Sequence, residues 1–364
     1  ADPGGMMNDQ QHLPHLFSSL AIGPVTIRNR IVSSGHDTVM AVEGKVTDQL
    51  IAYQAARAAG GAGLIVTQVA GVHVSAQYTS HVLMADDDSC IPGLTALAAA
   101  IHEHGATCFQ QLFHDGREMM ESSDGTLAVA LAPSAVPSER FMVTPRAMPL
   151  AQVREMVQCY GAAAERVCRA GFDGVEVVAS HGYLPAQFLN PSTNLRTDEW
   201  GGSPDARQRF LTEALRRVRR AVGSDFVVGV RLSGDERTEG GLDTAAAVAV
   251  ATALDADNLV DYVSVCAGSS ASLAGSLHIA APMSETAAYV APLSAAVRAA
   301  VTVPVMVAGR INQPQEAELI LQNGQADLCA MTRAMICDPE LATKALTGRH
   351  EEIRACVGCN QACI

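Results

Sequence analysis

Residues 305–333 read VMVAGRINQPQEAELILQNGQADLCAMTR, and this stretch decides the predicted fold. Two short apolar runs, Val305–Ala308 and Asp327–Met331, flank a helical pattern that runs from Pro314 to Asn323. Proline in the first turn and Gly324 after the last turn are typical helix boundaries. Short runs rich in Val, Leu and Ala, without a polar alternate face, are typical of strands that are buried on both sides. The stretch therefore predicts one strand–helix–strand unit with parallel strands.

The same alternation extends from this unit to both ends of the chain. The further predicted strands are Arg30–Ser34, Gly63–Gln68, Thr107–Leu112, Gly174–Val178, Phe226–Leu232 and Val260–Cys266. The further predicted helices are Thr47–Ala59, Pro92–His104, Ala151–Ala170, Pro204–Val222, Thr244–Leu254 and Glu285–Ala300. Eight strands that alternate with helices predict an α/β protein with a (β/α)8 TIM barrel. A doubly wound open sheet is the alternative, but no Gly-x-Gly-x-x-Gly motif follows any strand.

Size and composition bound the domain organisation and the compartment. The chain has 364 residues and a net charge of −13, which argues against nucleic acid as a partner. No apolar run is long enough to span a membrane, and no signal peptide is recognisable. Ten cysteines without a secretory signal favour a cytoplasmic protein. We expect a tag and a disordered N-terminus over residues 1–12, the barrel over 13–340 and a C-terminal tail over 341–364.

Two strand ends near the C-terminus carry candidate phosphate ligands. Gly309 and Arg310 follow the seventh strand, and Arg333 follows the eighth. Phosphate sites in (β/α)8 barrels are built from the loops after these two strands. Glycine lets backbone N–H groups approach a phosphate, and arginine adds a forked donor. The alternative is that both arginines pair with carboxylates at the barrel mouth.

Two other strand ends carry candidates for a flavin ring. Arg231 ends the fifth strand, where it would stabilise negative charge on a reduced flavin, and an internal ion pair is the alternative. Gln111 ends the third strand, and an amide both donates and accepts, as the edge of a flavin ring requires. Gln110 and Gln111 lie on opposite faces, so we expect only one of them to point into the barrel.

His181 and Tyr183 follow the fourth strand and are the candidate catalytic residues. Histidine hydrogen-bonds an anionic oxygen, and tyrosine donates a proton. Long segments after the third and fourth strands, residues 113–150 and 179–203, surround the same end of the predicted barrel. Loops at the carboxyl ends of barrel strands build active sites.

Several long motifs resemble one flavoprotein family. They are GFDGVEVVASHGYLPAQFLNP at 171–191, NLRTDEWGGS at 194–203, NRIV at 29–32, QLFHDGR at 111–117 and GRI at 309–311. Together they resemble the signature of the old yellow enzyme family, the NADH:flavin oxidoreductases. The resemblance implies a (β/α)8 barrel with FMN bound non-covalently at its mouth. It implies that the flavin ring lies beside Ser33, Ser34, Gly35 and His36, that its pyrimidine edge is held by Gln111 and Arg231, and that its phosphate is held by Gly309, Arg310, Thr332 and Arg333.

Three positions depart from the family pattern. Val178 stands where many relatives have a first histidine, so only His181 remains of a pair of donors. Asp37 follows His36 after the first strand, so no thiol is available there for the covalent flavin link of the methylamine dehydrogenases. Thr332 replaces the usual glycine before the strand-eight arginine, and its backbone N–H still reaches a phosphate.

Cys356, Cys359 and Cys363 close the chain with C-x2-C-x3-C spacing, which suits an iron–sulfur cluster. A zinc site or three unrelated thiols are the alternatives. The spacing resembles the 4Fe–4S motif of the multidomain branch of the family, which includes dienoyl-CoA reductases and trimethylamine dehydrogenases. A fourth cysteine follows about a dozen residues later in that branch. We therefore expect a cluster in the full-length protein, incomplete in this chain, and a C-terminal FAD/NAD domain beyond it.

The expected activity is NAD(P)H-linked reduction of an activated C=C bond of the enoate or dienoyl type. The alternative is oxidation or demethylation of a small N-methylated amine, with hydride transfer to FMN. Two rivals are a Schiff-base aldolase barrel and a non-catalytic electron-transfer subunit. The only lysines, Lys45 and Lys344, do not end strands, which argues against the aldolase. The expected partners are a small-molecule substrate and further copies of the chain in a homo-oligomer, with no nucleic acid and no membrane.

Overall fold

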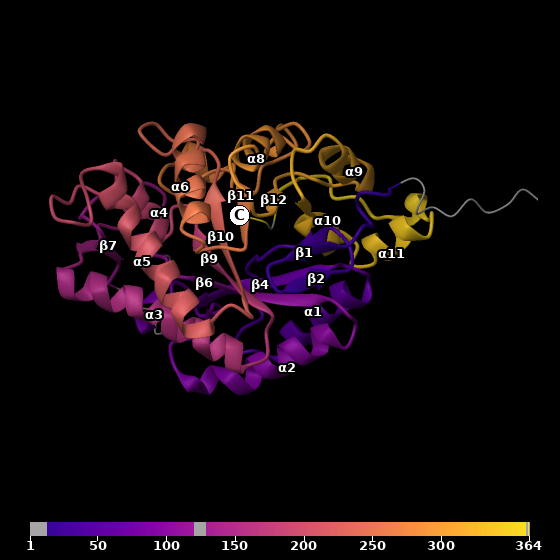
Figure 1. Cartoon of the computed structure of the whole chain (residues 1–364), viewed down its shortest axis with the longest axis horizontal. Helices are drawn as coiled ribbons and strands as arrows, with labels where there is room; N and C mark the ends of the chain where they lie inside the picture. The colour runs from indigo at the N-terminus through magenta and orange to yellow at the C-terminus, as the bar shows by residue number, and fades with distance from the viewer. Residues whose placement is uncertain (1–12, 120–128, 362, 364) are drawn as a thin grey trace, which may run out of the picture.

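Eight parallel strands close into a barrel in the computed structural model, which describes residues 13–119, 129–361 and 363 (Figure 1). The ring closes because β3 pairs with both β13 and β4. The predicted (β/α)8 barrel is therefore confirmed, with small differences at the strand ends. The barrel strands are β3 (Ile31–Ser33), β4 (Leu64–Gly71), β6 (Thr107–Phe113), β9 (Gly174–Ala179), β10 (Val227–Ser233), β11 (Tyr262–Cys266), β12 (Val305–Ala308) and β13 (Leu328–Ala330).

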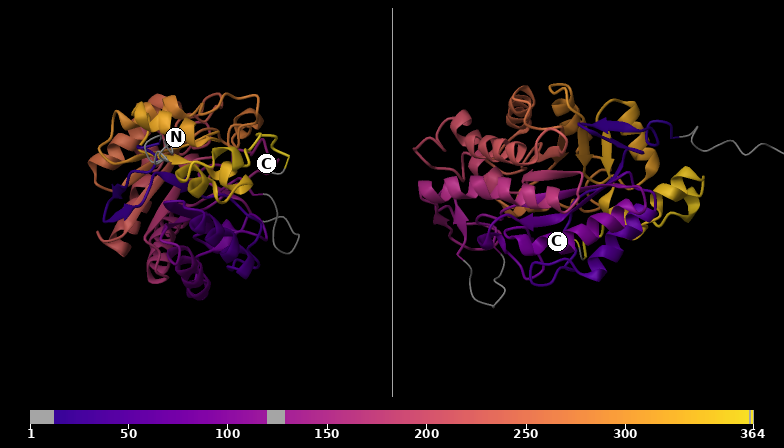
Figure 2. Two further views of the ribbon diagram at one scale, coloured as in Figure 1. Left: turned by 90° about the vertical axis from the view of Figure 1, so that its right-hand side faces the viewer. Right: turned by 60° about the horizontal axis from the view of Figure 1, so that its bottom comes forward.

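Helices surround the strands on the outside of the barrel (Figures 1 and 2). Seven long ones are α1 (Asp48–Ala59), α2 (Ile91–His102), α3 (Leu150–Arg169), α5 (Pro204–Val222), α6 (Thr244–Ala256), α8 (Ala291–Arg298) and α9 (Pro314–Gln322). Shorter helices are α4 (Leu184–Leu189), α7 (Leu273–Ser276), α10 (Thr332–Cys337) and α11 (Leu341–Leu346). Single 3-10 turns cover Val74–Ala76, Asp88–Cys90 and His350–Glu352. The short strands outside the barrel ring are β1 (Leu20–Ile22), β2 (Val25–Ile27), β5 (Leu83–Met84), β7 (Leu131–Ala132) and β8 (Arg146–Ala147).

The predicted helix over Glu285–Ala300 is shorter than expected, because α8 begins only at Ala291. Ala288 has a φ of 55°, a left-handed conformation that an α-helix excludes. Pro292 then occupies the first turn of α8, where its missing N–H costs no hydrogen bond. The residues before Ala291 therefore form part of the loop after β11 and contribute to the barrel mouth.

The β1–β2 hairpin closes the amino end of the barrel. Ile22 and Ile27 of the hairpin are fully buried and pack in one cluster with Val32, Phe109 and Tyr262 inside the barrel. The β1–β2 hairpin shields the barrel interior from water at that end. Candidate functional side chains therefore lie at the opposite end of the barrel, at the carboxyl ends of the strands.

The barrel interior is filled by stacked aromatic rings and the glycines that make room for them. Phe109 and Tyr262 stack with ring centroids 5.6 Å apart. A Cβ atom at Gly229 would lie 2.1 Å from Cε1 of Tyr262, and one at Gly174 would lie 2.8 Å from Cδ1 of Phe109. Because both glycines belong to barrel strands, their missing side chains let the rings occupy the axis of the barrel.

The segment after residue 340 packs against the outside of the barrel. The backbone N–H of Thr343 in α11 donates to the carbonyl of Gly60 at 2.9 Å, next to the end of α1. Lys344 and Asp338 form an ion pair of 2.7 Å with Asp338 fully buried, and Asp338 also accepts from the backbone N–H of Arg354 at 3.0 Å. These contacts lead the C-terminal tail back toward the barrel mouth. The predicted N-terminal tag over residues 1–12 lies outside the described residues.

No helix in the described ranges is long and apolar enough to cross a membrane.

Replacement of Gly229 by alanine tests the packing of the interior. The new methyl group would collide with the Tyr262 ring, so we expect the free energy of unfolding to fall by about 1–3 kcal/mol. Denaturant unfolding of flavin-free protein gives this value. The loss should be smaller in a Tyr262→Leu background, because the colliding ring is gone. If the losses of stability from the two substitutions simply add in the double variant, a collision with the Tyr262 ring is not the cause of the effect at position 229.

Candidate functional site

The carboxyl ends of the barrel strands surround one cavity of about 480 Å³. This volume lies within the range of about 300–1,000 Å³ that is usual for small-molecule and cofactor sites. The structure brings nearly all of the predicted flavin and substrate residues to its walls. They are Ser34, Gly35, His36, Gln111, His181, Tyr183, Arg231, Gly309, Arg310, Thr332 and Arg333. Ser33 is fully buried behind the wall, and its hydroxyl has no hydrogen-bond partner in the described part of the chain.

Beneath the cavity wall, the lining residue Gln111 belongs to a hydrogen-bonded chain of three buried polar side chains. Gln111 Nε2 donates to Glu176 Oε1 at 2.6 Å, and the hydroxyl of Tyr262 donates to Glu176 Oε2 at 2.8 Å. Gln110 points away, since its Nε2 donates to the carbonyl of Gln68 at 2.6 Å. Gln111 is therefore the inward glutamine of the pair, with its amide orientation fixed by Glu176. The sequence analysis missed Glu176, although a carboxylate inside an apolar strand is a recognisable signal.

Gly35 lies directly against the amide of Gln111. A Cβ atom at position 35 would lie 2.1 Å from Oε1 of Gln111, so no larger residue fits without moving the glutamine. The carbonyl end of the Gln111 amide thus stays open to the cavity. Gly35 follows the end of β3 and Gln111 lies in β6, and both residues line the cavity.

His36 is held on the outer side of the cavity wall. Its Nε2 lies 2.6 Å from the hydroxyl of Tyr53, and its Nδ1 lies 2.9 Å from the carbonyl oxygen of Ser34. Burial lowers the pKa of His36 to about 4, so the ring is neutral at physiological pH. Both ring nitrogens are engaged, which fixes the side chain as part of the wall.

Arg231 places a buried cation at the cavity wall, where the carboxylate of Glu176 acts on it without a direct ion pair. Its side chain is buried, and within the described residues neither Nε nor Nη1 has a hydrogen-bond partner. The alternative of an internal ion pair is not supported, because no described carboxylate lies within ion-pair distance of its guanidinium. A buried, unsatisfied charged donor carries a large desolvation penalty. The Nε and Nη1 of this arginine are therefore available to an acceptor on a ligand.

His181 is a neutral imidazole in a strained position beside Arg231. Its φ is 60°, and its backbone N–H donates to Ser233 Oγ at 3.2 Å. Burial, and then the positive charge of Arg231, lowers the pKa of His181 to about 3. Nε2 lies 3.6 Å from Cys266 Sγ, while Nδ1 has no partner among the described residues. The ring therefore carries no positive charge at neutral pH, and its Nδ1 is free to form a hydrogen bond with a ligand.

Tyr183 begins α4 and directs its phenol ring into the cavity. Its ring makes edge-to-face contacts with Phe113 and Tyr78 at centroid distances of 5.2 and 6.4 Å. Burial, and then the carboxyl of Asp37, raises the pKa of Tyr183 above its ordinary value. The phenol is therefore protonated at neutral pH and is suited to donate a proton or a hydrogen bond.

Asp37 is an acid that lines the same cavity, and its sequence position alone did not point to a role. The hydroxyl of Tyr78 donates to its Oδ2. Burial raises the pKa of Asp37 to about 7, so both protonation states are populated near neutral pH. Within the described residues no cationic side chain forms an ion pair with it.

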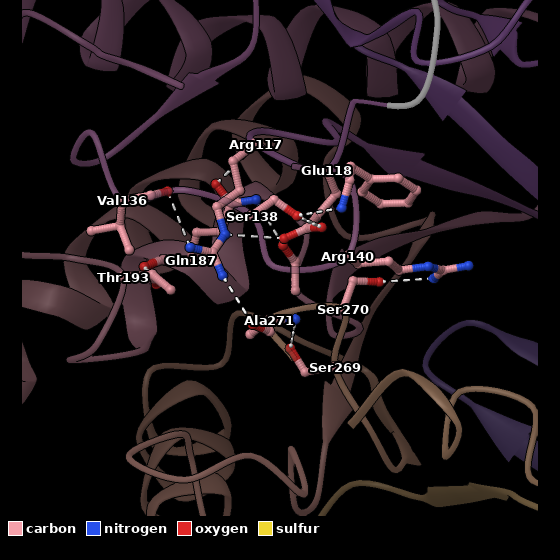
Figure 3. Close-up of polar contacts among 12 residues, drawn as sticks. Arg117, Glu118, Val136, Ser138, Arg140, Gln187, Thr193, Ser269, Ser270 and Ala271 are labelled. Atoms are coloured by element: carbon pink, nitrogen blue, oxygen red, sulfur yellow. Dashed lines mark hydrogen bonds and ion pairs between the residues drawn. The ribbon is translucent and has the colours of Figure 1, made fainter. Parts of the chain in front are cut away.

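The long loop after β6 supplies a second acid and its support (Figure 3). Arg117 Nε donates to Glu118 Oε1 at 3.0 Å, and Ser138 Oγ donates to Glu118 Oε2 at 2.9 Å. Burial raises the pKa of Glu118 to about 7. Arg117 also donates to the carbonyls of Val136 and Pro137 at 3.2 and 2.9 Å, which fixes the path of the loop. Residues 120–128 of this loop lie outside the described ranges.

Arg140 of the same loop reaches across the cavity to the loop after β11 (Figure 3). Its Nη1 donates to Ser270 Oγ at 3.2 Å, and its guanidinium lies over the ring of Phe141. Glu118, Arg140, Phe141 and Ser270 all line the cavity. The prediction that the loop after the third strand borders the site is confirmed for this part.

The end of β12 presents a glycine and an arginine as predicted. A Cβ atom at Gly309 would lie 2.2 Å from Cγ2 of Val290, so only glycine fits between β12 and the start of α8. Arg310 has a φ of 50°, and its Nη1 donates to the carbonyl of Pro282 at 2.7 Å. Its buried Nε has no partner in the described part of the structure.

The end of β13 adds Thr332 and Arg333. Thr332 Oγ1 accepts from the backbone N–H of Ser34 at 3.1 Å, which joins the ends of β3 and β13. Arg333 Nη1 donates to the carbonyl of Ala281 at 2.9 Å and to Asn360 Oδ1 at 2.8 Å. Those partners are neutral oxygens, and no described carboxylate forms an ion pair with Arg310 or Arg333. The carboxylate-pairing alternative is therefore not supported.

The three cysteines of the tail do not form a metal site in the described residues. Cys356 is partly buried, and Cys359 and Cys363 are exposed, with Cys363 at the rim of the cavity. No group of three or more cysteine, histidine, aspartate or glutamate side chains that are described could hold a metal ion. The iron–sulfur assignment of Cys356, Cys359 and Cys363 therefore stays a prediction.

The chain is similar to known flavoproteins over nearly its whole length. A model of the NADH:flavin oxidoreductase / NADH oxidase family matches residues 15–352. A metal reductase of Desulforamulus reducens is 40% identical over 96% of this chain and 51% of its own length. An N,N-dimethylglycine/sarcosine dehydrogenase of Chromohalobacter salexigens is 36% identical over 95% of this chain and 50% of its own length.

A solved structure agrees with these relatives. The complex of 2-naphthoyl-CoA reductase with 2-naphthoyl-CoA superposes with a TM-score of 0.88 at 31% identity, over 96% of this chain and 55% of that chain. The chain thus spans about half the length of the relatives that it matches. The family match confirms the predicted resemblance, and the shared barrel explains why the motifs lie at strand ends. This chain belongs to the NADH:flavin oxidoreductase / NADH oxidase family.

Proposed function

We propose that the cavity binds FMN without a covalent link. The observation that carries the proposal is a row of cavity-lining arginines that form no ion pair with a described carboxylate, with the buried Arg231 at one end and the partly buried Arg310 and Arg333 at the other. FMN has a matching pattern, with a polar pyrimidine edge and a phosphate separated by a flat ring and a ribityl chain. The turn after β3 offers Gly35, His36 and Asp37 and no thiol for a covalent bond.

The residues fit the parts of FMN as follows. Gln111 and Arg231 meet the pyrimidine edge, because one has both a donor and an acceptor and the other has free N–H groups. Ser33, Ser34, Gly35 and His36 border the ring, and Gly35 leaves the space that the ring needs. Arg310 and Arg333 bind the phosphate, together with the backbone N–H groups near Gly309 and Thr332. The cavity volume suits a cofactor of this size.

We propose NAD(P)H-linked reduction of an activated C=C bond as the reaction of this site. Bound FMN supplies the hydride transfer between nicotinamide and substrate, and the protein supplies positioning and electrostatics. Tyr183 carries a proton at neutral pH and donates it to the substrate carbon. His181 is neutral and donates a hydrogen bond to a substrate oxygen. Because position 178 is valine, the substrate oxygen meets one imidazole only.

A second candidate is oxidation or demethylation of a small N-methylated amine, and Asp37 favours it. A cavity-lining carboxyl beside the rings of Tyr78 and Tyr183 is a suitable site for an ammonium group, through charge attraction and cation–π contact. The name of one relative, an N,N-dimethylglycine/sarcosine dehydrogenase, agrees with this chemistry. Both candidates use the same flavin site and differ in the direction of hydride transfer.

Two rival classes fit less well. Lys344 pairs with Asp338 outside the cavity, and Lys45 is not among the cavity residues, so no lysine is placed for a Schiff base. A purely electron-transferring subunit would not need Tyr183 and His181 at the open end of the site. The C-terminal domain that the longer relatives suggest, an iron–sulfur cluster on Cys356, Cys359 and Cys363, and a homo-oligomer remain proposals.

Replacement of Arg333 by alanine tests the phosphate site. Loss of a charged hydrogen-bond donor should weaken FMN binding by about 1.5–3 kcal/mol. Flavin fluorescence quenching on addition of FMN to flavin-free protein measures the Kd. Arg349→Ala, which removes an exposed arginine far from the cavity, is the matched control and should leave the Kd unchanged. Equal FMN affinity in Arg333→Ala and wild type would show that the phosphate lies elsewhere.

Replacement of Tyr183 by phenylalanine tests the proton donor. The ring and its edge-to-face contacts remain, so only the hydroxyl is lost. A general acid contributes typically about 10²–10⁴-fold, so reoxidation of the reduced flavin by an enone should slow by at least about 10²-fold. Stopped-flow reduction by NADH or NADPH should be unchanged, because that step takes no proton from Tyr183.

Tyr160→Phe is the control for Tyr183→Phe, since Tyr160 is fully buried against α5 and far from the cavity. If the wild type does not react with enones and Tyr183→Phe slows the reduction of the flavin by amines, Tyr183 acts in the amine oxidation of the second candidate. If neither half-reaction changes, Tyr183 has no catalytic role.

The pH dependence of cation binding tests the amine candidate. The raised pKa of Asp37, about 7, means that its carboxylate form is populated as pH rises through 7. Binding of tetramethylammonium, whose charge does not titrate, should therefore strengthen about tenfold between pH 6 and pH 8. Absorbance changes of the bound flavin report the Kd. Asp37→Asn should abolish both the affinity and its pH dependence, while Asp225→Asn, an exposed control, should change neither. A pH-independent Kd in the wild type would exclude Asp37 as an ammonium ligand.

A further inference from the structure

The cysteine-bearing tail lies directly on the two arginines of the proposed phosphate site. Arg333 Nη1 donates to Asn360 Oδ1 at 2.8 Å, and Asn360 stands between Cys359 and Cys363 in the sequence. The same Nη1 donates to the carbonyl of Ala281 at 2.9 Å. Arg333 is therefore oriented by one acceptor from the loop after β11 and one from the tail.

A glycine of the tail packs against the second arginine. A Cβ atom at Gly358 would lie 3.0 Å from Nη1 of Arg310, and Gly358 has a φ of 66°. The backbone N–H of Met283 donates to the carbonyl of Gly358 at 2.9 Å, while Arg310 Nη1 donates to the carbonyl of Pro282 at 2.7 Å. Residues 280–283 and 358–360 thus form a bracket around both arginines.

Asn360 also joins the two segments of the bracket, because its Nδ2 donates to the carbonyl of Ala280. One amide side chain therefore contacts Arg333 with its oxygen and the loop after β11 with its nitrogen. Its φ of 55° is tolerated by asparagine better than by most residues, which fits a residue chosen for its side chain.

The neutrality of this partner matters for phosphate binding. An arginine side chain loses considerable conformational freedom when it is fixed, and a partner that fixes it beforehand removes that cost from ligand binding. A carboxylate in the same place would also neutralise the guanidinium, whereas an amide oxygen leaves its full charge for the ligand. Asn360 orients Arg333 and leaves its charge unchanged.

We propose that Asn360 is a positioning residue for the phosphate of FMN, so that the segment between Cys359 and Cys363 sets the affinity for the cofactor. This inference rests on the proposed FMN site. Asn360 acts through Arg333 and does not itself contact the flavin ring. Its effect is therefore specific to ligands that carry the phosphate.

A comparison of FMN with riboflavin tests the proposal, since riboflavin has the same ring and ribityl chain without the phosphate. Both Kd values are measured by fluorescence quenching on the flavin-free 364-residue chain. Asn360→Ala should weaken FMN about tenfold, near the lower limit for one hydrogen bond to a charged group, and leave riboflavin unchanged. Gln361→Ala, an exposed neighbour in the tail, is the control and should change neither Kd.

A second variant separates positioning from simple tail packing. Asn360→Asp keeps the size of the side chain but pairs Arg333 with a carboxylate that competes with phosphate. It should weaken FMN at least as much as Asn360→Ala, again with riboflavin unchanged. The melting temperature of each flavin-free variant shows whether the fold is retained.

The outcomes distinguish this inference from the proposed function. If Arg333→Ala weakens FMN and both Asn360 variants bind it like wild type, the role of Asn360 is refuted and the phosphate site stands. If Arg333→Ala and the Asn360 variants all leave FMN binding intact, the phosphate site itself is wrong. If Asn360→Ala weakens FMN and riboflavin equally, Asn360 acts on the fold, and the positioning role is refuted.

Discussion

The buried guanidinium of Arg231 is the constraint on which the rest of the cavity depends. It lies at the mouth of a closed barrel, and within the described residues its Nε and Nη1 have no partner. The carboxylate beneath the cavity wall, Glu176, accepts from Gln111 and Tyr262. Glu176 therefore fixes the glutamine amide without forming an ion pair with the arginine. Such an arrangement is stabilised when a ligand supplies the missing acceptors, and the pyrimidine edge of the proposed FMN would supply them.

The titratable side chains at the barrel mouth fall into two groups by their protonation state at neutral pH. His181 and Tyr183 are neutral across the physiological range, because burial lowers the pKa of the imidazole to about 3 and raises that of the phenol. Asp37 and Glu118 have pKa values raised to about 7 by burial, so they ionise as pH rises through neutrality. The negative charge of the substrate cavity thus increases with pH. A cationic amine would bind more tightly as this negative charge grows, whereas a neutral enone would respond little, so the pH dependence of ligand binding separates the two proposed substrate classes.

The barrel and the residues at its strand ends could be predicted from the sequence, and the reason is physical. Parallel strands buried on both faces leave long apolar runs, and the residue that follows each run must lie at the same rim. Gln111, Arg231 and Arg333 were found in this way. Asp37, Glu118 and Arg140 were missed because loops carry no periodicity, and their proximity depends on how the chain folds back. The contact between Asn360 and Arg333 joins loops whose path the sequence does not specify, and the start of α8 depended on one left-handed residue, Ala288.

Acid precipitation of the purified protein tests the central claim of a non-covalent FMN site most directly. The account predicts a yellow protein whose flavin is released in full into the acid supernatant, where chromatography identifies it as FMN in an amount stoichiometric with the chain. The turn after β3 offers no thiol to retain it. A protein that is colourless and does not bind added FMN, or flavin that stays with the precipitate, would contradict the account.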